Sequence, residues 1–206
     1  MKINYLLIIV SALFCFELSA AESAVMSQIR QKYNKNSTIR SQFDLDIFWS
    51  VREKKEHKTG SLIIAPQNRF KVELNGEVFV SNGDRFWHYS KSISQVTIDN
   101  VARIDLSSLP SNLLQKFLFQ YKYVEIEKNG SETVLEWKKD IAENSVYTSM
   151  KVWASNSGEV TKLQMTDRNG NVNTYSFHKT IFGGKVPAGT FDFQVPKNAQ
   201  VLNNYE

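Results

Sequence analysis

Most of this chain consists of short segments in which apolar and polar residues alternate, with turn-forming residues between them. Phe43, Leu45 and Ile47 alternate with polar residues, which predicts that a long half-buried strand begins after Asn36. Further strand-like segments follow at 60–64, 69–74, 77–80, 85–89, 94–98, 121–127, 133–138, 147–154, 160–166, 172–182 and 191–195. Asn-Gly pairs at 82–83, 129–130 and 169–170 are typical of hairpin turns. Because parallel strands need crossovers of a dozen residues or more, this spacing favours an antiparallel meander.

Two segments have helical periodicity instead. From 22 to about 35, Val25, Ile29 and Tyr33 recur every four residues and form one narrow apolar face. The segment 105–120 predicts a second amphipathic helix, since Pro110 suits a first helical turn and four apolar residues gather on one side. These four are Leu113, Leu114, Phe117 and Leu118. The simplest arrangement is one large curved sheet with both helices on one face, and the space between them is a candidate apolar cavity.

The N-terminus predicts export. Lys2 precedes an apolar run from Leu6 to Phe16, and small residues up to Ala21 follow, which is the pattern of a cleaved secretory signal peptide. We therefore expect a signal peptide at 1–21 and one mature domain at 22–206. Cys15, the only cysteine, would leave with the signal peptide. A lipid-modified Cys15 is the alternative, but the bulky Phe14 before it disfavours lipoprotein processing.

The sequence offers little chemistry. The net charge of +4 is mild and interspersed, so nothing calls for nucleic acid as a partner. The three histidines show no metal-ligand spacing, and no nucleophile elbow, phosphate loop or dinucleotide fingerprint is present. We therefore predict neither catalytic residues, nor a metal, nor a cofactor. Asp44 and Asp46 project from the same face of a strand, so an envelope hydrolase using this acid pair is the remote alternative.

Four segments together resemble the outer-membrane lipoprotein carrier family, LolA. The stretch VSNGDRFWHYSKSISQVTI at 80–98 is similar to the signature hairpin of that family. The stretch 39–47 resembles its first strand, GSLIIAPQNRFKV at 60–72 its punctuated hairpin, and AGTFDFQVPKNAQVL at 188–202 its closing strand. Their order and spacing agree over essentially the whole mature chain.

The resemblance implies an incomplete antiparallel β-barrel of about eleven strands, with a helical lid over an apolar cavity. It also implies a monomeric, non-enzymatic periplasmic carrier of acylated lipoproteins. Such a carrier would accept its cargo from an inner-membrane ATP-driven exporter and deliver it to an outer-membrane acceptor, which some cells lack. The alternatives are a membrane-anchored acceptor or a lipid-sensing regulator on the same fold.

Two residues depart from the family pattern. Leu45 stands where members often carry Gln, and Ala65 stands where they often carry an Arg that is associated with latching the lid. A different latch or a more open cavity is therefore expected. We predict that the lid consists of Val25, Ile29, Tyr33, Leu113, Leu114, Phe117 and Leu118. The predicted sheet-side lining consists of Trp49, Phe70, Leu74, Phe79, Trp87 and Trp153.

Overall fold

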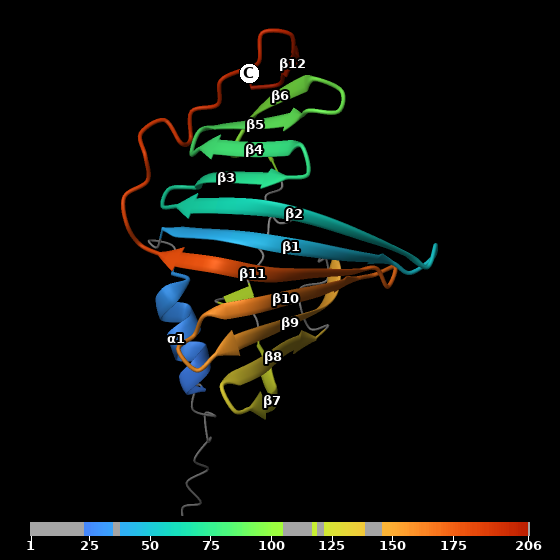
Figure 1. The fold of residues 1–206 in the computed structure, drawn as a ribbon, viewed down its shortest axis with the longest axis vertical. Coiled ribbons are helices and arrows are strands. Elements are labelled where there is room, and N and C mark those ends of the chain that lie inside the picture. Colours follow the sequence, from blue (N-terminus) through green and yellow to red (C-terminus); the bar gives the residue numbers. More distant parts are fainter. Residues whose placement is uncertain (1–22, 35–37, 105–116, 119–121, 139–145, 206) are drawn as a thin grey trace, which may run out of the picture.

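The computed structural model describes residues 23–34, 38–104, 117–118, 122–138 and 146–205. These residues form one helix, α1 (Ala24–Lys32), and a single sheet of twelve strands (Figure 1). The strands are β1 (Ile39–Trp49), β2 (Lys54–Ala65), β3 (Arg69–Leu74), β4 (Glu77–Asn82), β5 (Arg85–Ser90), β6 (Gln95–Asn100), β7 (Val124–Asn129), β8 (Glu132–Lys138), β9 (Tyr147–Ser155), β10 (Val160–Asp167), β11 (Val172–Phe182) and β12 (Gln200–Asn203).

The order of the strands is β12-β6-β5-β4-β3-β2-β1-β11-β10-β9-β8-β7. Hairpins connect the successive strands from β1 to β6, and β1 pairs with both β2 and β11. It thereby joins the two halves of the chain, with Phe43 opposite Gly60 on one side and opposite Phe177 on the other. The outermost strands, β12 and β7, do not meet, so the sheet is open. The predicted open, curved, mainly antiparallel sheet is confirmed, with twelve strands rather than about eleven.

One face of the sheet, which we call the inner face, carries the main hydrophobic core. Alternation places every second residue of β1 from Ile39 to Ile47 on this face, and all five of these residues are buried. Burial of each large apolar side chain contributes about 1.5–3 kcal/mol. The strands contribute Ile39, Phe43, Leu45, Ile47, Leu62, Phe70, Val72, Leu135, Trp137, Met150, Val152, Ala154, Val160, Leu163, Met165 and Tyr175 to this core.

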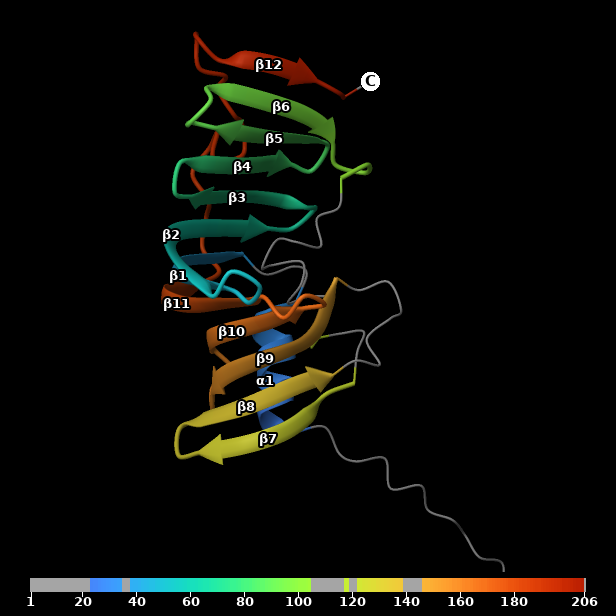
Figure 2. The same cartoon turned by 90° about the vertical axis from the view of Figure 1, so that its right-hand side faces the viewer.

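Helix α1 packs on the inner face beside β9 (Figures 1 and 2). The Ser23 side chain caps its N-terminus by accepting a hydrogen bond from the Met26 N–H at 3.2 Å. Arg30 and Lys32 lie in its last turn, where their positive charges interact favourably with the negative end of the helix dipole. The β9–β10 turn touches the backbone of α1, since a Cβ built on Gly158 would lie 2.5 Å from the Gln28 carbonyl carbon. Only glycine permits this close approach.

The opposite face, which we call the outer face, carries a second, smaller core over β4, β5 and β6. Val80, Trp87 and Val96 are buried there. The C-terminal segment 183–199 connects β11 to β12 along this side of the molecule (Figure 1), and Phe193 packs on Tyr89 with ring centroids 5.9 Å apart. After this segment, β12 pairs in parallel with β6.

The predicted strand at 191–195 is therefore wrong. This segment is turn and coil, and the last strand is β12. Phe191 lies near the Arg69 guanidinium, at 5.7 Å from ring centroid to Cζ, and Phe193 packs on Tyr89. The alternation in this segment thus reflects two aromatic side chains that pack on the outer face, and not pairing with a neighbouring strand.

The first predicted helix is confirmed as α1. Most of the second predicted helix, at 105–120, lies outside the described residues. Within this segment the structure describes Phe117 and Leu118, and both are helical. The predicted signal peptide also lies outside them. In the part of the chain that the structure describes, no helix combines the length and apolar character needed to cross a membrane.

Candidate functional site

Much of the inner face is apolar, but α1 covers only part of it. Over β3, β4 and β5, Leu74, Phe79 and Phe86 are only partly buried, and they pack against the main core, to which the buried Phe70 belongs. The Phe86 ring centroid lies 6.0 Å from that of Phe70 and 6.4 Å from that of Phe79. Because three of them are aromatic, we call the four residues Phe70, Leu74, Phe79 and Phe86 the aromatic patch. It offers an apolar ligand a partly exposed surface that continues into the core.

The aromatic patch ends in a polar cluster on the same face. The His88 ring stacks on Phe79 with centroids 4.5 Å apart. His88 Nε2 lies 2.7 Å from Glu77 Oε2, and the Ser90 hydroxyl donates to Glu77 Oε1 at 2.7 Å. The aromatic patch therefore has an apolar side toward β2 and a hydrogen-bonding side toward β6.

On the other half of the inner face, polar contacts fasten the covering segments. Arg30 Nε donates to the Leu118 carbonyl at 2.7 Å, and the Ser23 N–H donates to the Tyr123 hydroxyl at 3.2 Å. The Tyr33 hydroxyl accepts from the buried Val160 N–H at 3.0 Å, and burial raises the pKa of Tyr33 well above its usual value. These contacts tie α1 to residues far away in the sequence.

The structure brings together most of the predicted lid. Val25, Ile29, Tyr33, Phe117 and Leu118 are all buried in the main core. Leu113 and Leu114 lie outside the described residues. The arrangement of the described members matches that of a covering element on the inner face, while their contact with lipid stays a prediction.

The predicted sheet-side lining is divided between the two faces. Phe70, Leu74 and Phe79 lie on the inner face. Trp49 follows the inner-face alternation of β1 but is 37% exposed at the end of the strand. Trp87 belongs to the outer core, and Trp153 lies between the buried Val152 and Ala154, which places it on the outer face beneath the Lys162 ammonium. The three tryptophans are thus not brought together with the aromatic patch.

Sequence reasoning missed Phe86 and Trp137 as inner-face candidates. Both positions could have been found from alternation, because Phe86 precedes the outer-face Trp87, and Trp137 follows Thr133 and Leu135 at every second residue of β8. At the two positions that depart from the family pattern, Leu45 and Ala65 are both buried.

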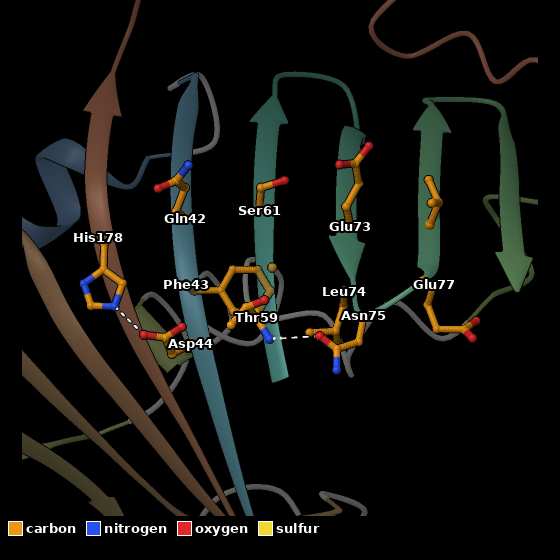
Figure 3. A pocket seen from close by; sticks show the side chains of 13 residues that line it. Gln42, Phe43, Asp44, Thr59, Ser61, Glu73, Leu74, Asn75, Glu77 and His178 are labelled. Atoms are coloured by element: carbon orange, nitrogen blue, oxygen red, sulfur yellow. Dashed lines mark hydrogen bonds and ion pairs between the residues drawn. The ribbon is translucent and has the colours of Figure 1, made fainter. Parts of the chain in front are cut away.

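A pocket of about 600 Å³ lies mainly on the outer face, over β1–β4 and β11 (Figure 3). Polar side chains dominate its lining, including Gln42, Asp44, Thr59, Ser61 and Glu73. His178 Nε2 lies 2.9 Å from Asp44 Oδ2 across β11 and β1. This pocket suits water and polar groups, and it shares only Leu74 with the aromatic patch.

Both carboxylates of the β1 acid pair, Asp44 and Asp46, lie within hydrogen-bonding distance of histidine rings on the outer face. His57 Nδ1 lies 2.8 Å from Asp46 Oδ1, and this hydrogen bond, with a smaller effect of Asp44 at 3.9 Å, raises the pKa of His57. Among the described residues, no group of three or more His, Cys, Asp or Glu side chains could hold a metal ion.

Comparison with known proteins gives a consistent result. The family model described as outer membrane lipoprotein carrier protein LolA matches residues 34–194. An outer-membrane lipoprotein carrier protein of Chromobacterium violaceum is 24% identical over 191 residues and covers 89% of both chains. One of Legionella pneumophila is 24% identical over 209 residues, covering 97% of this chain and 98% of its own. An uncharacterized conserved protein of Thermus thermophilus shares the fold, with a TM-score of 0.55 at 13% identity, covering 87% of this chain and 96% of its own.

Proposed function

Because the chain belongs to the LolA family of outer-membrane lipoprotein carriers, we propose that it carries lipoproteins through the periplasm by burying their acyl chains against its inner face. Among the contacts described above, the aromatic patch carries the proposal. It is an apolar surface that is partly exposed and continuous with the main core. The protein acts as a carrier without catalysis, on one domain at 22–206, after removal of a signal peptide at 1–21.

The energetics explain why such a surface should be partly covered. Burying an acyl chain contributes about 0.8 kcal/mol per methylene, or about 12 kcal/mol for about 15 methylenes. Several chains together would exceed the limit of about 20 kcal/mol that known noncovalent complexes reach. A carrier must also release its cargo. Binding becomes reversible when the incoming chains have to displace side chains that fill the same space.

We assign this covering role to α1 and to Phe117 and Leu118. Their apolar side chains are buried in the main core. The Arg30 hydrogen bond to the Leu118 carbonyl joins the two covering elements, and it offers a latch in a chain that has Ala65 at the family's Arg position. Cargo that enters over the aromatic patch would displace these elements in exchange for its own acyl chains.

The partners follow from the family. The cargo is an acylated lipoprotein, the donor is an ATP-driven exporter in the inner membrane, and the receiver is an outer-membrane acceptor where one exists. A monomer suits this shuttle. A membrane-anchored acceptor would instead stay with the membrane fraction, so recovering the protein in the soluble periplasmic fraction supports the carrier.

The test places a charge in the aromatic patch. Phe79→Asp puts a carboxylate where an acyl chain would lie, so we expect binding of a fluorescent diacylated lipopeptide to weaken more than about tenfold. Binding is measured by anisotropy with the purified protein, and circular dichroism verifies that each variant is folded.

The matched control is Val51→Asp. Val51 is 85% exposed in the β1–β2 hairpin, far from the patch, and the same charge there should leave binding unchanged. Equal lipopeptide affinities for folded Phe79→Asp and the unsubstituted protein would refute the assignment of the aromatic patch.

A further inference from the structure

Two buried polar atoms on β8 lack hydrogen-bond partners among the residues that the structure describes. They are the indole Nε1 of Trp137 and the hydroxyl of Thr133, and both residues are fully buried. Thr133, Leu135 and Trp137 share the inner face by alternation, and Leu135 and Trp137 belong to the main core. The inner face therefore holds unused hydrogen-bonding capacity in its most apolar part.

An unpaired donor in this position is energetically unfavourable. Buried polar groups in native proteins nearly always have partners, so an orphaned one needs an explanation. The indole N–H can only donate, and it cannot rotate independently of its ring. The Thr133 hydroxyl, in contrast, can rotate and can both donate and accept. Trp137 is thus the stronger indication that a ligand supplies an acceptor.

The surroundings of Trp137 place this donor at the covered part of the inner face. Its ring meets Phe117 edge-on with centroids 6.3 Å apart, and it lies 5.6 Å from the Tyr123 ring. Phe117 belongs to the covering elements, and the Tyr123 hydroxyl bonds the N–H of Ser23 at the start of α1. A ligand that displaces Phe117 therefore uncovers the Trp137 ring.

We propose that the Trp137 Nε1–H donates a hydrogen bond to an acyl ester carbonyl of the bound lipid. This inference rests on the proposed function, which brings acyl chains to the inner face. Each ester-linked chain begins with a carbonyl that also loses its water on burial. Pairing this acceptor with the orphaned donor satisfies both groups at once, so Trp137 distinguishes an acylated cargo from a plain hydrocarbon.

The test compares two ligands that differ only in their ester carbonyls. One is a lipopeptide whose cysteine carries a diacylglyceryl group, and the other is its dialkyl ether analogue with the same chain length. We expect the protein to bind the ester about tenfold more tightly than the ether, which corresponds to about 1.4 kcal/mol. In Trp137→Phe the ratio of the ether and ester dissociation constants should fall to about one. Since both ligands are measured on the same variant, any packing loss from the smaller ring cancels.

Trp87→Phe is the matched control, because Trp87 lies in the outer core and should keep the tenfold preference. A preference that survives in Trp137→Phe, or that is absent from the unsubstituted protein, overturns the role of Trp137. Failure of both lipopeptides to bind overturns the proposed function instead.

Phospholipids carry the same ester carbonyls, so ester- and ether-linked phosphatidylglycerol form a second pair of ligands. An ester preference confined to the phospholipid pair would support carbonyl recognition by Trp137 and reject lipoproteins as its source.

Discussion

Gly158 should determine how closely α1 docks on the sheet. A Cβ at this position would lie 2.5 Å from the Gln28 carbonyl carbon and 2.6 Å from the Ile29 nitrogen, both of which are helix backbone atoms. Because backbone atoms cannot move aside as a side-chain tip can, Gly158→Ala must push α1 away from the β9–β10 turn. The substitution therefore tests the docking of the helix directly.

Two terms add to the expected loss of stability. Gly158 has a φ of +76°, a conformation that costs an L-residue about 1–2 kcal/mol. Overpacking against α1 adds about 1–3 kcal/mol. We expect Gly158→Ala to lower the free energy of unfolding by about 3 kcal/mol in total. At about 2–4 °C per kcal/mol for a domain of this size, the Tm falls by about 6–12 °C.

Gly130 provides the matched control. It also has a positive φ, +56°, but a Cβ there would meet nothing within 4 Å. Gly130→Ala should therefore show only the conformational cost of about 1 kcal/mol, or about 2–4 °C. Urea and thermal unfolding of both variants give the difference, which isolates the helix contact. Equal losses in the two variants would refute the close docking of α1.

Two more predictions concern single hydrogen bonds. Tyr33→Phe leaves the buried Val160 N–H without its acceptor and should lower the free energy of unfolding in urea by about 1–3 kcal/mol. Tyr205→Phe removes an exposed hydroxyl and should lower it by less than about 0.5 kcal/mol. Similar losses in the two variants would contradict this prediction. Asp46→Asn should lower the raised pKa of His57 toward 6.5 in an NMR titration, and an unchanged pKa would contradict the contact. Because that pKa is raised, the stabilisation is complete below about pH 6.5 and is lost as pH rises through the folded pKa.

The local pattern was sufficient to predict the hairpins. The segment 69–74 was predicted to be a strand and is β3, and the Asn82-Gly83 turn connects β4 to β5 as expected. Of the predicted sheet-side lining, Phe70, Leu74 and Phe79 lie together on the inner face in the register of β3 and β4. Such features depend on neighbours in the sequence, so they can be read without knowing the fold.

The same pattern failed where a distant partner decides the outcome. Trp87 and Trp153 were predicted to be part of the sheet-side lining, but both lie on the outer face. Phe191 and Phe193 alternate as in a strand but pack on Arg69 and Tyr89. Aromatic content and periodicity do not tell which face of a sheet is covered, or by which segment.

By itself, the sequence determined the open antiparallel sheet, the amphipathic first helix and the resemblance to the lipoprotein carriers, since alternation, turn residues and motif order are local properties of the chain. Only the tertiary structure decided which face is inner, because β1 must pair with both β2 and β11 before the two halves share one core. It also decided that the Trp137 donor lacks a partner among the described residues. Hydrogen-bond satisfaction depends on groups that lie far apart in the sequence and meet only in the folded protein.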